Sequence, residues 1–132
     1  MRMWQHVLES VRAHLLLAQR LYEHGQKFSG AWNFGPRDED AVAVRQLAEN
    51  FVKHWGAGEL TFSPEEKTSS ADPVFRLNTH KAQTQLGWRP AIPLKEAVAW
   101  TVEWYKAFYA DPASSWRTTE DQIQRFMRSS GG

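Results

Sequence analysis

The sequence predicts a helix-rich α/β domain with a few short strands. Several long stretches carry apolar residues at the spacing of amphipathic helices, and two of them end at a glycine. The other apolar runs are short and bounded by Gly or Pro, which favours brief strands over helices. At 132 residues the chain can build one hydrophobic core and is too short for two ordinary domains.

Two helices are expected in the N-terminal half. Apolar residues recur at helical spacing over 8–22 and predict a helix over 9–24, which Gly25 ends. A cleaner stripe predicts a second helix over 44–55, which Gly56 ends. The first stripe, which we expect to face the core, consists of Leu8, Val11, Leu15, Ala18, Leu21 and Tyr22.

Extended segments and loops separate these helices. The chain starts with an extended segment over 1–7, and short strands are expected at 31–36, 59–62 and 74–77. The stretch 63–73, rich in Ser, Glu, Lys and Pro, is typical of a surface loop. The charged run 37–40 predicts another loop, whose acidic residues suit the N-terminal dipole of the helix that follows.

The C-terminal half is expected to contain three more helices. Thr79 can cap a short helix that continues through Leu86, and Pro90 and Pro93 then fix an extended connector. A long amphipathic helix follows over 94–109. A last polar helix should begin near Thr118 or Thr119 and end near Arg128, so the domain would span 1–128, with a disordered tail over 129–132.

The composition excludes several classes of protein. A net charge of +1 and a pI of about 8.1 give no indication of binding to nucleic acid or to an anionic membrane. Without cysteine the chain can form no disulfide, thiolate zinc site or cysteine nucleophile. No apolar run approaches the roughly 20 residues of a membrane span. We therefore expect a cytoplasmic protein.

The motifs of catalysis and of cofactor binding are missing from the sequence. There is no Gly-rich dinucleotide fingerprint, no phosphate-binding P-loop and no YxxxK pair. The five histidines form neither HxH nor HExxH, so we interpret them as structural. We expect no catalytic residue, no cofactor site and no metal site in this chain.

Two side chains could nevertheless bind a ligand. Arg2 lies on the extended segment, where its planar guanidinium could hold a diphosphate at two points or could simply be solvated. Asn33 lies in an apolar run, where a buried amide needs hydrogen-bond partners that a neighbouring loop or a ligand could supply.

Several motifs together resemble the latter part of the CDP-glucose 4,6-dehydratases, which are extended short-chain dehydrogenase/reductases. They are RMWQHVLE over 2–9, AWNFGP over 31–36, LGWRP over 86–90 and the helix over 94–105. LGWRP alone indicates only the wider superfamily of NAD-dependent epimerases and dehydratases, whereas the first two motifs are specific to this branch. With the stretch 119–126, the resemblance covers most of the chain.

The resemblance implies a division of labour that this chain shares only in part. In that family a Rossmann domain holds NAD and the catalytic groups, and a smaller C-terminal lobe holds the nucleotide sugar. This chain resembles the lobe alone, so the Rossmann core and the NAD site are missing. The resemblance implies Arg2 as a diphosphate contact, Asn33 as a second contact near the phosphates, and Gln5 and His6 as neighbours of the site.

The function implied is that of a C-terminal fragment of a CDP-glucose 4,6-dehydratase-like enzyme. Such an enzyme converts CDP-glucose to CDP-4-keto-6-deoxyglucose for deoxysugar synthesis, and the fragment alone should be inactive because it lacks a hydride acceptor. Its implied partners are a CDP-glucose-type nucleotide sugar and a Rossmann-domain chain. A non-catalytic interaction module, and a lobe of a different nucleotide-sugar epimerase or dehydratase, remain open as alternatives.

Overall fold

The computed structural model describes residues 2–62 and 76–131. Within them, α-helices dominate and the strands form one two-stranded antiparallel sheet, in which Arg2 pairs with Val42 and Met3 with Ala41. The predicted helix-rich α/β class is therefore confirmed. In chain order the elements are β1 (Arg2–Met3), α1 (Val7–His24), η1 (Gly25–Phe28), η2 (Asp38–Asp40), β2 (Ala41–Val42), α2 (Val44–Trp55), η3 (Ala82–Leu86), α3 (Leu94–Ala110), η4 (Pro112–Ser114) and α4 (Ser115–Ser130).

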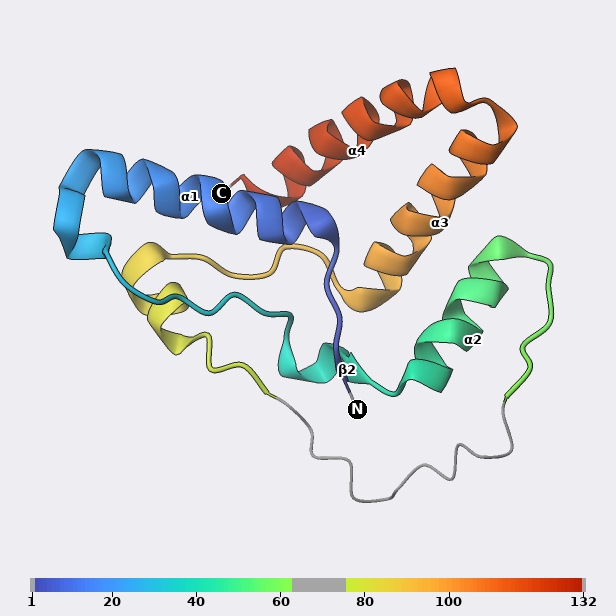
Figure 1. Ribbon diagram of the computed structural model, residues 1–132, viewed down its shortest axis with the longest axis horizontal. Coiled ribbons are helices and arrows are strands. Elements are labelled where there is room, and N and C mark those ends of the chain that lie inside the picture. Colours follow the sequence, from blue (N-terminus) through green and yellow to red (C-terminus); the bar gives the residue numbers. More distant parts are fainter. Residues whose placement is uncertain (1, 63–75, 132) are drawn as a thin grey trace.

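Helix α3 lies between α2 and α4 and packs against both (Figure 1). One side of α3 presents Leu94, Val98 and Val102 to an aromatic and aliphatic stripe on α2 that includes Phe51 and Trp55. Another side contributes to a separate cluster, whose buried members are Ile92, Ala97, Trp100 and Phe126 of α4. Apolar residues on two sides of α3 thus connect α2 on one side with α4 on the other.

A third cluster lies against α1. Ala13 of α1, Ala82 and Leu86 of η3, and Trp88 are buried together with Phe28. The exposed fraction of Trp88 is 0%, and the edge of its ring meets the ring of Phe34 at 5.2 Å between centroids. Between η3 and Trp88, Gly87 adopts φ +69°, a left-handed conformation that side chains rarely allow and that ends the helix.

The side of α1 that faces the core was predicted wrongly. Val11, Leu15 and Tyr22 have 44%, 66% and 93% of their surface exposed, whereas the buried residues of α1 are Glu9 and Ala13. Ala13 is small enough for η3 to approach α1 closely, and the polar Glu9 is buried because backbone N–H groups bind it. Of the predicted stripe, Leu8 alone is partly buried, against the cluster around Trp100, and the other members are exposed.

Two of the predicted strands do not form. Residues 31–36 and 59–62 make no strand ladder, although Trp32 and Phe34 still pack against the Trp88 core. Residues 31–36 pack against the core without pairing with a strand. A short apolar run in the sequence is compatible with either arrangement. The predicted strand over 74–77 falls partly, and the predicted loop over 63–73 wholly, outside the described residues.

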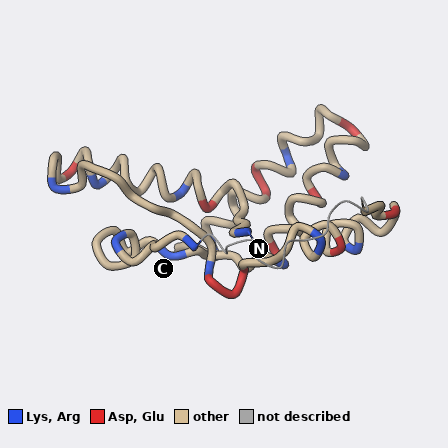
Figure 2. Tube along the Cα trace, turned by 60° about the horizontal axis from the view of Figure 1, so that its bottom comes forward, with Lys and Arg blue, Asp and Glu red and all other residues tan. Residues whose placement is uncertain are grey.

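The helix ends differ from the predicted caps in an instructive way. Asp40 Oδ1 accepts a hydrogen bond of 2.9 Å from the backbone N–H of Leu94, the first residue of α3. Asp40 therefore caps α3 and not the next helix in the chain, α2. Figure 2 shows this acidic turn as a red loop, with basic and acidic positions interspersed elsewhere. Asn78, and not Thr79, accepts the bond from His80 N–H. Helix α4 continues through Ser130, two residues beyond the predicted end.

Candidate functional site

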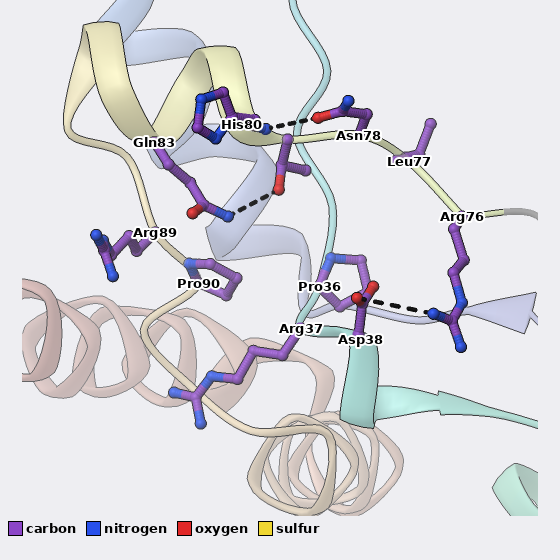
Figure 3. Close-up of a pocket in the computed structure, with 11 residues that line it drawn as sticks. Pro36, Arg37, Asp38, Arg76, Leu77, Asn78, His80, Gln83, Arg89 and Pro90 are labelled. Carbon is purple, nitrogen blue, oxygen red and sulfur yellow. Dashed lines mark hydrogen bonds and ion pairs between the residues drawn. The ribbon is translucent and has the colours of Figure 1, made fainter.

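A cavity of about 750 Å³ opens between three segments of the chain. Its walls come from the turn after residue 35, from the stretch that leads into η3, and from the connector before α3 (Figure 3). Each segment contributes one arginine: Arg37, Arg76 and Arg89. We call this cavity the arginine pocket.

Positive charge is in excess in the arginine pocket. Three arginines line it against one aspartate, Asp38. Arg76 Nη1 lies 3.9 Å from Asp38 Oδ2, and both side chains are largely exposed, so this ion pair stabilises little (Figure 3). Arg37 Nη1 lies 3.6 Å from the exposed carboxylate of Glu39. Arg37 Nη2 also donates to the carbonyl of Ala91 at 3.4 Å. The ion pairs of Arg37 and Arg76 are loose enough to be exchanged for an anion.

Local hydrogen bonds fix the wall that contains the start of η3. The backbone N–H of His80 donates to Asn78 Oδ1 at 3.0 Å, and the side-chain amide of Gln83 donates to the Thr79 hydroxyl at 2.9 Å (Figure 3). Leu77 Cδ1 lies 3.2 Å from where a Cβ would stand on Gly35, so a larger residue at Gly35 would press on this wall.

The first turns of α1 hold the segment that carries Arg89. Glu9 Oε1 accepts hydrogen bonds from the backbone N–H groups of Ala91 at 2.6 Å and Ile92 at 2.8 Å. Arg12 Nη1 donates to the carbonyl of Arg89 at 2.9 Å. Burial raises the pKa of Glu9, although the two N–H donors act in the opposite direction. This clamp positions one side of the arginine pocket.

The four residues that the resemblance assigns to the site do not share one cavity. Asn33 does not line the arginine pocket, but its amide donates to the carbonyl of Asn78, which does, at 3.4 Å. Arg2 is exposed on β1 and lines neither cavity. Gln5 and His6 line a second cavity of about 340 Å³. We call the second cavity the helix pocket, because α1, α3 and α4 form it.

His6 is both a pocket residue and the N-cap of α1. Its Nδ1 accepts from the backbone N–H of Leu8 at 3.3 Å, and its ring meets Trp100 edge-on. Burial lowers the pKa of His6 from its ordinary value of 6.5, because a charged imidazole loses hydration there. The folded chain therefore favours neutral His6, with the ring proton on Nε2.

Acid should destabilise the fold through His6. Because the unfolded chain binds a proton here more readily, the stabilisation is complete above about pH 6.5 and is lost as the pH falls through the lowered pKa of the folded state. Protonation of Nδ1 also removes the cap, an effect of about 1 kcal/mol. Denaturant unfolding between pH 7.5 and 5 should show a steeper loss for the wild type than for His6→Asn, whose side-chain oxygen can still cap. Parallel pH profiles would contradict this assignment.

The arginines of the pocket were missed by sequence reasoning. They lie on three separated segments, and only the fold brings them to one cavity. A weak signal was present, since Arg37 follows Gly35-Pro36 and Arg89 lies inside the LGWRP motif. Across 2–62 and 76–131, no group of three or more His, Asp or Glu side chains is placed to hold a metal ion. None of the helices in this part combines the length and hydropathy of a membrane span.

Comparison with known proteins relates the chain to sugar-nucleotide enzymes. No model of a protein family matches it. It is 42% identical over 107 residues to the CDP-glucose 4,6-dehydratase of Salmonella typhimurium, a match that covers 81% of this chain and 30% of the relative. It is 29% identical over 105 residues to the dTDP-glucose 4,6-dehydratase of Streptomyces niveus, covering 80% of this chain and 29% of that relative. The predicted resemblance is confirmed, and the chain spans less than a third of either relative's length.

Proposed function

We propose that this chain, whose sequence is similar to those of nucleotide-sugar 4,6-dehydratases, binds a CDP-glucose-type nucleotide sugar and is inactive by itself. In this proposal residues 1–128 are a substrate-binding lobe that holds the diphosphate in the arginine pocket. The observation that supports it most is that three arginines, Arg37, Arg76 and Arg89, line one cavity in a chain related to such enzymes.

The chemistry of the pocket suits a diphosphate. A guanidinium presents a planar fork of N–H donors that can bind two phosphate oxygens at once, and the bonds are charge-assisted. Arg76 can exchange its loose contact with Asp38 for a phosphate at small cost, because both partners are solvated. The cavity of about 750 Å³ lies within the range of ligand sites.

The four residues assigned by resemblance are supported to different degrees by their positions in the structure. Asn33 is the best supported of the four, since it bonds to the backbone of a residue that lines the arginine pocket. Arg2 stays a predicted diphosphate contact that would have to reach the ligand from β1. Gln5 and His6 stay predicted neighbours of the substrate, although both line the helix pocket.

The dehydratase reaction needs more than this chain supplies. Removal of water from the hexose proceeds through oxidation at C4, which requires a hydride acceptor, and the chain carries no dinucleotide fingerprint and no YxxxK pair. We infer that NAD and the catalytic groups would come from a Rossmann-domain partner. The purified chain mixed with CDP-glucose and NAD should bind the sugar nucleotide in calorimetry and form no keto product. Detectable turnover would contradict the proposal.

An interaction module is the second candidate, and the surface of α1 favours it. Val7, Val11 and Leu15 follow one another at four-residue spacing with 66%, 44% and 66% of their surface exposed. Such an apolar stripe on a helix is typical of a surface that another protein covers. The two candidates separate in one titration, because an interaction module without a ligand site would show no saturable binding of CDP.

A further inference from the structure

One acidic side chain stands among the three arginines of the arginine pocket. Asp38 lines this cavity, and its Oδ2 lies 3.9 Å from Nη1 of Arg76. Figure 3 shows the carboxylate turned toward Arg76. A carboxylate at this place brings negative charge to a cavity that we propose to hold phosphates. Asp38 therefore opposes the binding of an anion there, and the opposition grows with the charge of the anion.

The backbone of the acidic turn holds Asp38 at the pocket. The N–H of Asp40 donates to the Arg37 carbonyl at 3.0 Å, and the N–H of Ala41 donates to the Asp38 carbonyl. Asp40 is buried and caps α3, and Ala41 starts β2, which pairs with β1. The Asp38 side chain takes no part in these bonds and is 71% exposed. The backbone thus fixes the position of Asp38, and the fold does not depend on its carboxylate.

The charge of the pocket lining matches a diphosphate that is esterified at both ends. With His80 neutral, Asp38 lowers the charge of the lining from three positive charges to two. In a sugar nucleotide both phosphates are esterified on either side of the diphosphate, and each carries one negative charge. In a free nucleoside diphosphate the terminal phosphate has a second ionisation near about pH 6, so this molecule carries nearly one more negative charge at neutral pH. The two ligands therefore differ in charge at the end where the sugar is attached.

We propose that Asp38 is a specificity-determining residue, which makes the arginine pocket discriminate against the free nucleoside diphosphate and in favour of the sugar nucleotide. This inference rests on the proposed function, because it concerns the ligand of the same pocket. Asp38 leaves enough positive charge for a doubly esterified diphosphate and repels the additional charge of a terminal phosphate. The site thereby distinguishes two ligands that share the same base and the same two phosphates.

The expected discrimination is modest, because Asp38 and Arg76 are both largely exposed to water. Two unit charges in water at contact distance change a dissociation constant by about fivefold, and dissolved salt screens part of this effect. We therefore expect Asp38 to weaken the binding of the free nucleotide about threefold relative to the sugar nucleotide at low salt. Both ligands break the loose contact between Asp38 and Arg76, so its loss cancels when the two affinities are compared.

Calorimetric titration of the full chain with CDP-glucose and with CDP, at about pH 7.5 and low salt, tests this assignment. In Asp38→Asn the affinity for CDP should rise about threefold more than the affinity for CDP-glucose. The substitution keeps the shape of the side chain and the backbone bonds of the turn. Asp121→Asn removes the same charge from an exposed position on α4 outside both cavities, and it should leave the ratio of the two affinities unchanged.

The outcomes of these titrations separate this assignment from the proposed function. If both compounds bind to the wild type and the ratio of their affinities is the same in Asp38→Asn, the assignment is overturned and the proposed function stands. If neither compound binds to the wild type, the proposed function fails and the assignment fails with it. At about 0.5 M salt the difference between the wild type and Asp38→Asn should largely disappear, because the charges are then screened. A difference that persists at high salt would contradict charge repulsion as its cause.

Discussion

Replacing Trp88 by alanine is expected to lower the free energy of unfolding by about 3–5 kcal/mol, the usual cost of removing a large buried side chain. Trp88 is wholly buried at the centre of the cluster that joins α1, η1 and η3. The helices that surround the Trp88 ring cannot move together enough to fill the space that its removal leaves. At 132 residues, such a loss is a large fraction of the total stability. Urea unfolding followed by far-UV circular dichroism measures it.

Two further variants control this prediction. Trp116→Ala, at a tryptophan with 70% of its surface exposed on α4, should change the unfolding free energy by about 0.5 kcal/mol or less. Trp88→Phe should cost less than Trp88→Ala, because it keeps an aromatic ring and removes an indole N–H that is buried without a partner among the described residues. If the two alanine variants were equally stable, Trp88 would not be at the centre of this core.

Replacing Glu9 by alanine should cost about 2–4 kcal/mol, since it leaves one buried and one partly buried backbone N–H group without an acceptor, at about 1–3 kcal/mol for a fully buried group and less for a partly buried one. The lost bonds are those from Ala91 at 2.6 Å and Ile92 at 2.8 Å, which hold the connector between Arg89 and α3. We also expect weaker binding of CDP by this variant, because the connector carries one arginine of the pocket. Thermal unfolding and calorimetry measure the two effects.

Glu9→Gln separates the hydrogen bonds from the charge. Its amide oxygen can still accept from both N–H groups, so it should retain most of the stability near neutral pH. Because burial raises the pKa of Glu9 in the folded state, the ionised carboxylate costs stability as the pH rises from about 4.5 through that raised pKa. The wild type should show this decline and Glu9→Gln should not. A glutamine variant as unstable as the alanine variant would show that the charge, and not the acceptor, holds the connector.

Local patterns in the sequence predicted the helices well. Gly25 and Gly56 end α1 and α2 where their tolerance of positive φ predicted, at φ +57° and +82°. The side of α1 that faces the core could not be predicted, because its helical periodicity contains two candidate faces. Whether Leu15 or Ala13 is buried depends on the element that packs against α1. The side with the small residue Ala13 is buried, because it allows η3 to approach closely.

The site was predicted less well than the fold, for a related reason. Arg37, Arg76 and Arg89 come from segments separated by up to about two fifths of the chain, and each one alone is typical of a solvated arginine. The family resemblance instead implied Arg2 and Asn33 as phosphate contacts. Of these two, only Asn33 contacts a residue that lines the arginine pocket. Burial of Glu9, a charged residue in the first turn of α1, likewise depends on distant backbone donors that no local pattern reveals.

The most direct test of the proposed function is calorimetric titration of CDP into the full chain and three arginine variants. Arg89→Ala should weaken CDP binding about tenfold or more, the loss expected for a charge-assisted bond to phosphate. Arg117→Ala, at an exposed position on α4 outside both pockets, should bind as the wild type does. Arg2→Ala reports whether β1 also contributes. Wild-type affinity in Arg89→Ala would contradict a diphosphate site in the arginine pocket.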